Sequence, residues 1–379
     1  MVDLKTAALK LHSKYPGKLA TLVTTPIKNV EDMILAYTPG VAEPAKEIAS
    51  DINKVYDYTI KGHTIAVVSD GSAVLGLGNI GAEAAIPVME GKVALFKTFA
   101  NLDAFPICLT TQDPQEIIKI VRNIAPVFGG INLEDISAPR CFEIEEALQD
   151  LGIPVMHDDQ HGAAIVVLAG LINASKVVGK KMEDLKVMVL GAGAAGSAIA
   201  KLLSSKVSDV IVVDIKGIIN KEDATLDKYK LQLANVTNKS NLSGSLQDAL
   251  VGADVFVGVS RGDLLKRADI KLMNKKPIIF AMANPIPEIM PDEAKMGGAY
   301  IVATGRSDFP NQVNNSLAFP GIFKGALSIR AKRITEKMKV RAAEALANLV
   351  KNPTVDKIMP NAFDEGVTDA VAKAVAKIG

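Results

Sequence analysis

The segment Lys186–Gly196, with the sequence KVMVLGAGAAG, determines how the rest of the chain is interpreted. It starts with a short apolar run, Lys186–Leu190, of the kind that forms a buried β-strand. A GxGxxG pattern follows directly, and residues 197–204 continue as an apolar helical stretch. A strand, a glycine-rich turn and a helix in this order favour the binding of a dinucleotide over a tight turn that binds nothing.

The glycines and the next strand have separate tasks in such a site. Gly191 allows the tight turn, Gly193 lets a pyrophosphate approach the backbone, and Gly196 lets the helix lie close to the strand. The next apolar run, Val210–Val213, ends at Asp214, where a carboxylate can accept hydrogen bonds from a ribose. The predicted cofactor site therefore comprises Gly191, Ala192, Gly193, Ala194, Ala195, Gly196 and Asp214.

Strands and helices alternate on both sides of this segment. Before it, apolar runs predict strands at 64–69, 106–111, 128–133 and 153–156, and helices at 83–99 and 114–124. After it, strands are expected at 254–259, 277–281 and 299–303, and the chain from Gly325 is helical with a break at Asn352-Pro353. Such alternation implies parallel sheets covered by helices.

The expected fold class is therefore α/β, with two domains that each contain a parallel sheet flanked by helices. A length of 379 residues is sufficient for two or three domains. We place a metal- and substrate-binding domain at residues 1–165 and a Rossmann dinucleotide-binding domain at 166–310. Residues 311–379 are expected to form C-terminal helices that pack back on the first domain.

The composition excludes several classes of protein. Lys and Arg number 43 against 42 Asp and Glu, so the chain lacks the basic excess of nucleic-acid-binding proteins. Two cysteines, Cys108 and Cys141, exclude a disulfide scaffold and a four-cysteine zinc site. The apolar run Ala163–Ile172 is shorter than the roughly 20 residues of a membrane span. We expect a reduced, cytoplasmic protein with no nucleic-acid or membrane partner.

Acidic residues gather where predicted strands end. Glu134 and Asp135 follow one strand, and Asp158 and Asp159 follow the next. Carboxylates at strand ends can converge on Mg²⁺ or Mn²⁺, which prefer oxygen ligands, although the spacing alone favours helix capping and solvation. His157 and His161, four residues apart, suggest zinc only weakly, because a helix that begins near residue 162 leaves His157 outside it.

Two further residues are candidates for proton transfer. Lys92 has apolar neighbours on its face of the predicted helix, and burial there would lower its pKa and make it a base near neutral pH. The alternatives are that its amine reaches water, or that Lys97 is the functional lysine. Tyr37 lies in a turn ahead of a helix that begins near Ala42, where it is a proton donor or a packing residue; packing is favoured on this pattern alone.

Taken together, these segments resemble the malic enzyme family in its compact bacterial and archaeal form. The resemblance covers about residues 30–325 in order. It rests on the motifs Tyr37-Thr38-Pro39-Gly40, Ser69-Asp70-Gly71, Gly76-Leu77-Gly78-Asn79-Ile80-Gly81, Gly91-Lys92, Glu134-Asp135, His157-Asp158-Asp159-Gln160-His161-Gly162, the glycine loop, Ala283-Asn284-Pro285, Pro310-Asn311-Gln312-Val313-Asn314-Asn315 and Phe319-Pro320-Gly321-Ile322.

The resemblance implies oxidative decarboxylation of (S)-malate to pyruvate and CO₂, with reduction of NAD(P)⁺. Tyr37 would be the general acid and Lys92 the general base. The remaining assignments are Glu134, Asp135 and Asp159 as ligands of Mg²⁺ or Mn²⁺ with Asp158 in support, and Asn284 and Asn315 on the substrate and the nicotinamide. We also expect a homodimer. The alternatives are a metal-dependent oxaloacetate decarboxylase of the same family, an amino-acid dehydrogenase and a dinucleotide-sensing module without turnover.

Two features leave specificity open. Larger relatives place an arginine for a substrate carboxylate where this chain has Ser72-Ala73-Val74, so Ser72 or backbone amides of the glycine-rich turn must replace it. Asp214 favours NAD⁺, because its carboxylate would repel a 2′-phosphate. Lys216 and Lys221 follow closely and could neutralise that repulsion. We therefore expect NAD as the cofactor, with NADP as the second possibility.

Overall fold

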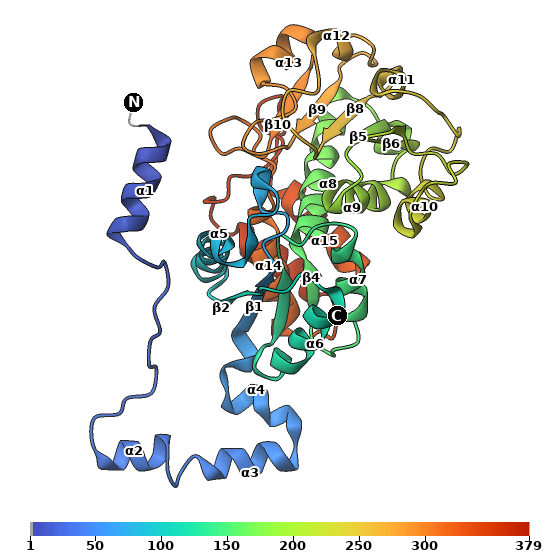
Figure 1. The fold of residues 1–379 in the computed structure, drawn as a ribbon. Coiled ribbons are helices and arrows are strands. Elements are labelled where there is room, and N and C mark those ends of the chain that lie inside the picture. The colour runs from blue at the N-terminus through green and yellow to red at the C-terminus, as the bar shows by residue number, and fades with distance from the viewer. Residues whose placement is uncertain (1–2, 379) are drawn as a thin grey trace.

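The computed structural model describes residues 3–378, in which two sheets are surrounded by helices (Figure 1). The first sheet is parallel throughout and has the order β2-β1-β3-β4. The second has the order β10-β9-β8-β5-β6-β7, and only its β6–β7 pairing is antiparallel. The strands are β1 Thr64–Ser69, β2 Asp103–Cys108, β3 Gly130–Leu133, β4 Val155–His157, β5 Lys186–Leu190, β6 Asp209–Asp214, β7 Gly217–Ile218, β8 Val255–Gly258, β9 Ile278–Ala281 and β10 Ile301–Thr304.

The predicted α/β class with a Rossmann second domain is confirmed. The largest shift among the strands is at β2, which lies three residues before the predicted 106–111 because its register with β1 pairs Asp103 with Thr64. β1 is buried along its whole length, and its alternate side chains enter two separate apolar clusters. A parallel strand covered on both faces has this uniformly apolar sequence.

Helices cover the first sheet on both faces. α5 (Gly81–Leu95) and the short π-helix η4 (Phe96–Ala100) pack on one face, and α6 (Pro114–Ile124) and α7 (Arg140–Ala147) contribute to the cluster on the other. In the second domain, α9 (Ala194–Ser204) follows the glycine loop. Shorter helices complete it: α10 Lys228–Ala234, α11 Leu246–Leu250, α12 Arg267–Ile270 and α13 Pro291–Gly297.

A long helix, α8 (Asp158–Val178), leads from the first sheet to the second domain. By length and apolarity it could cross a membrane, but most of it is buried inside this fold, beside α9 and α15. It begins at Asp158 and not near residue 162 as expected, because two carboxylates occupy its first turn, where the helix dipole favours negative charge. The domain boundary placed after residue 165 falls inside this helix.

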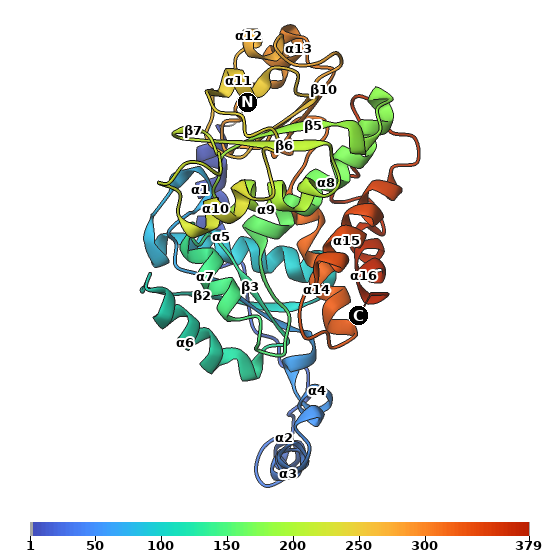
Figure 2. The ribbon, with the colours of Figure 1, turned by 90° about the vertical axis from the view of Figure 1, so that its right-hand side faces the viewer.

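The C-terminal helices are α14 (Phe319–Ser328), α15 (Glu336–Leu349) and α16 (Val367–Ala376), which lie together on one side of the molecule (Figure 2). Phe319 and Phe323 of α14 make edge-to-face ring contacts with Phe96 of η4, at centroid distances of 4.7 and 5.5 Å. Asn173 of α8 also holds the C-terminal segment in place. Its buried amide nitrogen donates hydrogen bonds to Ala347 O at 2.9 Å and to Ile358 O at 3.0 Å.

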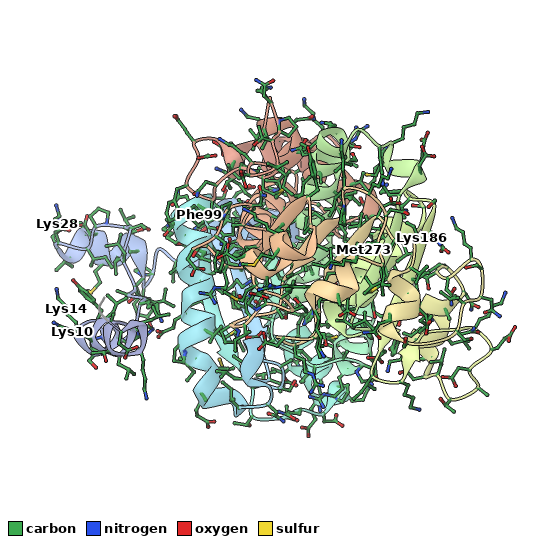
Figure 3. All side chains as sticks on the ribbon, turned by 90° about the horizontal axis from the view of Figure 1, so that it is seen from above. Lys10, Lys14, Lys28, Phe99, Lys186 and Met273 are labelled. Carbon is green, nitrogen blue, oxygen red and sulfur yellow. The ribbon has the colours of Figure 1, made fainter. Side chains whose placement is uncertain are left out.

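The N-terminal segment stands apart from this body (Figures 1 and 3). It carries α1 (Leu4–Lys14), α2 (Val30–Ala36), α3 (Ala42–Ser50) and α4 (Val55–Tyr58), and none of residues 3–60 is buried. Lys18 is one point of attachment, through hydrogen bonds to Glu90 and to the carbonyl of Pro87. We call residues 3–58 the arm. Large apolar side chains on the arm, such as Leu22 and Leu35, are at least 75% exposed.

Asn173 provides a test of how the C-terminal helices are held. Asn173→Ala should lower the free energy of unfolding by about 1–3 kcal/mol, because two buried carbonyls lose their donor. Urea denaturation followed by circular dichroism measures the change. Asn123→Ala is the matched control, since its amide bonds a carbonyl on the exposed face of α6, and it should change stability by less than about 0.5 kcal/mol. Equal effects of the two substitutions would contradict this account.

Candidate active site

A cavity of about 490 Å³ lies between the two domains, and half of the predicted site residues line it. Its first-domain wall includes Asp135 and Asp159, and its second-domain wall includes Gly193, Ala194 and Ala195 of the glycine loop. Asn284, in the loop after β9, and Asn315, just before α14, also line it. The structure thus brings two of the carboxylates, both asparagines and part of the glycine loop to one cavity.

Three carboxylates form a cluster at one edge of the first sheet. Glu134 and Asp135 follow β3, and Asp159 lies in the first turn of α8 after β4. Because β3 and β4 are parallel neighbours, their carboxyl ends meet, and one oxygen from each of the three side chains lies within 4.8 Å of the others. Asp135 has a left-handed backbone with φ of 52°, and its amide donates to Asp159 Oδ2 at 2.8 Å.

Lys92 of α5 is buried against this cluster. Its Nζ lies 2.6 Å from Asp158 Oδ2 and 2.7 Å from Glu134 Oε1, and 4.2 Å from the centre of the Phe319 ring. The prediction of a lowered pKa is wrong. Burial does act to lower the pKa of Lys92, but Asp158 and Glu134 outweigh it and raise the pKa above its ordinary value. The ammonium form is therefore the stable one in this arrangement.

The cluster carries more negative charge than Lys92 can balance. Glu134 and Asp158 pair with the amine of Lys92, and two further carboxylates, Asp135 and Asp159, lie beside Glu134. Burial, with the neighbouring aspartates, raises the pKa of Glu134 well above its ordinary value despite Lys92. Asp158 Oδ1 is buried and has no hydrogen-bond partner within residues 3–378. An oxygen-only donor set with excess negative charge fits Mg²⁺ or Mn²⁺.

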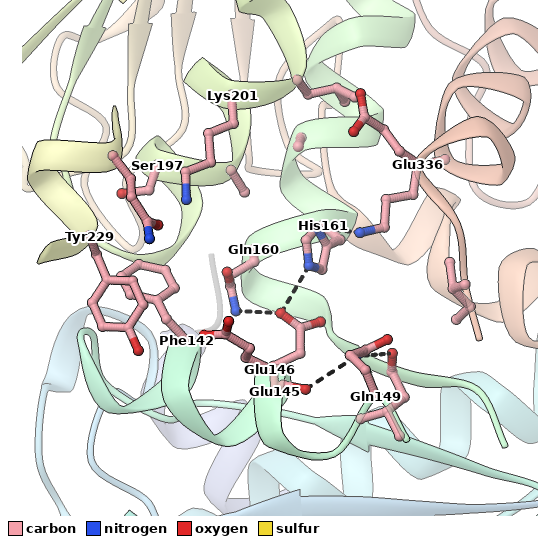
Figure 4. Close-up of a pocket in the computed structure, with 17 residues that line it drawn as sticks. Phe142, Glu145, Glu146, Gln149, Gln160, His161, Ser197, Lys201, Tyr229 and Glu336 are labelled. Atoms are coloured by element: carbon pink, nitrogen blue, oxygen red, sulfur yellow. Dashed lines mark hydrogen bonds and ion pairs between the residues drawn. The ribbon is translucent and has the colours of Figure 1, made fainter. Parts of the chain in front are cut away.

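The two histidines do not form a zinc site. His161 Nε2 lies 3.0 Å from Glu145 Oε2, and its Nδ1 lies 2.9 Å from Lys339 Nζ, so both of its nitrogens are engaged. These contacts line a second cavity, of about 410 Å³, beside α7 and α9 (Figure 4). His157 is buried at the end of β4. Lys97, the competing lysine, is half exposed and pairs with Asp103 at 2.9 Å, outside the site.

Glu145 of α7 holds the first turn of α8 from the side shown in Figure 4. Its carboxylate accepts hydrogen bonds from the His157 amide and the Gln160 side chain, each at 2.9 Å. Burial acts to raise the pKa of Glu145, but His161 and Lys339 outweigh it and lower the pKa to about 2. Glu145 therefore stays ionised and fixes the turn that carries Asp158 and Asp159. Nothing in the local sequence pattern indicates this role.

The glycine loop has the geometry that its sequence predicts. Gly191 adopts φ of 111°, which favours glycine, and its amide donates to Val213 O. A Cβ on Gly196 would lie 1.8 Å from Gly191 O, whereas one on Gly193 would meet nothing within 4 Å. Asp214, at the end of β6, lines an adjoining cavity of about 190 Å³ that Gly193 also lines.

The partner of Asp214 is a residue that the sequence analysis missed. Lys230 Nζ lies 2.6 Å from Asp214 Oδ2. Lys216 and Lys221 were the candidates to neutralise Asp214. Lys216 donates instead to Thr225 Oγ1, and Lys221 is absent from the residues that line this cavity. Lys230 lies 16 positions after Asp214 on α10, too far along the chain for a local pattern to connect them.

Two residues that were expected at the site, Tyr37 and Ser72, do not line the cavity. Tyr37 caps the end of α2 on the arm, is 68% exposed and does not line the cavity, so the structure does not bring it to Lys92. Ser72 does not face the cavity, because its hydroxyl donates to Asp70 Oδ1 at 2.5 Å and accepts from the Ser137 amide. From the same loop, Ala73 and Gly76 line the cavity instead.

The fold and the site define a class: a two-domain protein with a Rossmann dinucleotide-binding domain and a carboxylate cluster at the interdomain cavity. Comparison with known proteins is more specific. Residues 16–149 match the family model of the malic enzyme N-terminal domain, and residues 160–379 match that of the malic enzyme NAD-binding domain. The chain therefore belongs to the malic enzyme family and is an NAD(P)-dependent enzyme.

Individual relatives agree with this placement. The chain is 55% identical to the "Bifunctional malic/malolactic enzyme" of Bacillus subtilis, over 99% of this chain and 93% of the relative. It is 55% identical to the "NAD-dependent malic enzyme" of Geobacillus stearothermophilus, over 95% and 76%. The crystal structure of the NAD-dependent malic enzyme of Thermotoga maritima superposes with a TM-score of 0.94 at 52% identity, covering 99% of both chains.

We expect alanine substitutions at Gly193 and Gly196 to affect stability and cofactor binding differently. Gly193→Ala should leave the thermal unfolding midpoint unchanged, because its new Cβ meets no atom, yet weaken dinucleotide binding by about tenfold or more, since the methyl group blocks the pyrophosphate. Gly196→Ala should lower both stability and binding, because the helix must move away from Gly191. Differential scanning fluorimetry and a cofactor titration separate the two. If Gly193→Ala binds the cofactor normally, the loop is not the pyrophosphate site.

Proposed function

We propose that this chain catalyses the oxidative decarboxylation of (S)-malate to pyruvate and CO₂, with NAD⁺ as the preferred electron acceptor and a divalent metal as cofactor. One observation carries the proposal: a single interdomain cavity is lined by two carboxylates of the cluster, by both asparagines and by part of the glycine loop. These residues are Asp135, Asp159, Asn284, Asn315, Gly193, Ala194 and Ala195. A substrate held at the carboxylates therefore lies in the same cavity as a nicotinamide held at the loop.

The metal would be held by Glu134, Asp135 and Asp159, which supply oxygen ligands only. When bound, Mg²⁺ or Mn²⁺ supplies Lewis-acid stabilisation of the enolate that remains after CO₂ leaves. The protein positions the substrate with Asn284 and Asn315, which offer both donors and acceptors to a hydroxy acid.

We propose that Lys92 removes the proton of the malate C2 hydroxyl, because its amine pairs with the carboxylate cluster. Hydride leaves C2 for the nicotinamide as this proton is removed. To act as a base, Lys92 must first give up a proton, and Asp158 Oδ2, at 2.6 Å, is an acceptor within reach. This is the supporting role that we propose for Asp158.

Two related reactions are the main alternatives. An oxaloacetate decarboxylase of the same family would use the carboxylate cluster without a redox step, and the intact glycine loop with Asp214 weighs against it. The name of the Bacillus subtilis relative includes malolactic activity, which yields lactate in place of pyruvate. An assay that follows reduced cofactor, pyruvate and lactate together distinguishes all three reactions.

The metal assignment gives a direct prediction. With malate, NAD⁺ and Mn²⁺, the enzyme should form pyruvate and NADH in equal amounts, chelation should stop turnover, and added Mn²⁺ or Mg²⁺ should restore it. Asp159→Asn should lower kcat/KM about a hundredfold or more, because the Lewis acid contributes several kcal/mol. The matched control is Asp150→Asn, a surface carboxylate paired with Arg122, which should behave as wild type. Full activity of Asp159→Asn in metal-free buffer would overturn the assignment.

The arm leads us to propose a homodimer in which Tyr37 completes the site of the other copy. Tyr37 is the residue to which family resemblance assigns proton donation to C3, yet in its own chain it is 68% exposed on the arm and absent from the cavity wall. Apolar side chains along the arm, among them Leu22, Leu35 and Ile52, are more than 70% exposed. Such a surface is typical of one that another chain covers.

Mixing two inactive variants tests this exchange. Tyr37→Phe and Asp159→Asn chains should each be nearly inactive alone. If Tyr37 acts in the partner's site, each heterodimer has one intact site, and a statistical 1:1 mixture should recover about a quarter of wild-type activity. The mixture must be co-expressed or refolded together so that chains exchange. Recovery no greater than the average of the two variants would show that Tyr37 and Asp159 serve the same chain.

A further inference from the structure

We propose that Glu288 positions the nicotinamide end of the bound dinucleotide, because its buried carboxylate joins the two loops that follow β8 and β9. It is a positioning residue and not a catalytic one, since it does not line the interdomain cavity itself. The inference rests on the proposed function in one respect only, namely that the nicotinamide enters that cavity.

The loops after β8 and β9 lie where the nicotinamide half of a dinucleotide belongs. In the second sheet, β5 and its glycine loop have β6 on one side and β8 and β9 on the other. Asp214, at the end of β6, is the acceptor for the adenosine ribose. The other half of the cofactor therefore extends from the glycine loop across the ends of β8 and β9, because ligands of such sheets lie at the carboxyl ends of the strands.

Both loops contribute to the wall of the interdomain cavity, and Glu288 connects them. The residues of the two loops that line the cavity are Val259, Ser260, Met282, Ala283 and Asn284. Glu288 Oε1 accepts a hydrogen bond from the Ser260 amide at 2.9 Å, and its Oε2 accepts one from the Ala283 amide at 3.1 Å. Each carboxylate oxygen thus holds a different loop, and Asn284 directly follows one of the two amides that are held.

The carboxylate of Glu288 is committed to these backbone amides. Glu288 is 0% exposed. Burial raises its pKa, and the hydrogen bonds from the amides oppose that shift. Because both oxygens face N–H groups, the ionised carboxylate, which only accepts hydrogen bonds, is the form that fits. A glutamine of the same shape would turn an NH₂ group towards one of the two amides and leave that amide without an acceptor.

The surrounding backbone fixes Glu288 over the last residue of β8. The carbonyl of Glu288 accepts a hydrogen bond from the Leu265 amide at 3.0 Å. A Cβ on Gly258 would lie 2.3 Å from Glu288 Cδ, so the absence of a side chain at Gly258 gives the carboxylate its room. A Cβ on Gly76 of the first domain would lie 2.3 Å from Asn284 O. A displaced carboxylate would therefore disturb a loop against which the first domain also packs.

Binding of NADH and of ADP-ribose, measured by calorimetry on the full chain without malate, tests this directly. ADP-ribose lacks the nicotinamide, so wild-type protein should bind NADH at least about tenfold more tightly. In Glu288→Gln, the dissociation constant of NADH should rise by about tenfold, the size of a lost charge-assisted hydrogen bond, while that of ADP-ribose changes less than about threefold. The increase in NADH fluorescence on binding, which reports how the nicotinamide is enclosed, should diminish as well.

A second variant and a control separate this role from a purely structural one. Gly258→Ala should show the same selective loss of NADH binding, because its methyl group displaces the Glu288 carboxylate, and it serves alone if Glu288→Gln does not fold. The matched control is Asp254→Asn at the opposite end of β8, where a buried carboxylate accepts from the Lys186 amide and pairs with Lys180. It should lower the thermal unfolding midpoint and leave the ratio of the two dissociation constants unchanged.

A selective loss of NADH binding in Glu288→Gln or Gly258→Ala supports the proposal. Equal weakening of both ligands, unchanged NADH binding in both variants, or wild-type protein that binds NADH no more tightly than ADP-ribose would overturn it. The measurement needs no turnover, so its outcome is independent of the reaction. A protein that shows the selective loss yet fails to oxidise malate would refute the proposed function and leave this inference in place.

Discussion

The buried ammonium group of Lys92 is the interaction on which the rest of this active site depends. It joins three elements that are distant in sequence: α5, the strand end that carries Glu134, and the first turn of α8 with Asp158. Without it, two buried carboxylates would face two more with no opposing charge, an arrangement that costs several kcal/mol. Phe319 of α14 covers the same amine, so the C-terminal helices also pack around this one charge.

The first turn of α8, which Lys92 holds through Asp158, also positions residues of the interdomain cavity. On one side it places Asp159 beside Asp135, and on the other Glu145 fixes it through the His157 amide and the Gln160 side chain. The remainder of α8 packs against α9, which begins at the glycine loop. One rigid helix therefore sets the separation between the carboxylate cluster and the dinucleotide loop, which a hydride transfer between two bound molecules requires.

The sequence predicted those features that depend on short-range pattern. The strands of both sheets were recognisable because parallel strands buried on both faces are apolar throughout, and the glycine loop because only glycine accommodates its turn and close contacts. The grouping of Glu134, Asp135 and Asp159 was expected from strand ends and is present. The pKa of Lys92 was predicted wrongly, since its apolar helical neighbours are local and its carboxylate partners lie 42 and 66 positions away. The same reason hid Lys230 and Glu145, whose importance comes from residues that only the fold brings near.

The central claim is that one cavity holds the metal, the substrate and the nicotinamide around the Lys92 cluster. Anomalous diffraction from crystals grown with Mn²⁺, NAD⁺ and a non-reactive malate analogue tests it most directly. The account predicts a manganese peak between Glu134, Asp135 and Asp159, with the analogue between that ion and the nicotinamide and with Lys92 within hydrogen-bond distance of the C2 substituent. A manganese ion bound elsewhere, or an analogue separated from Lys92 by protein, would contradict it.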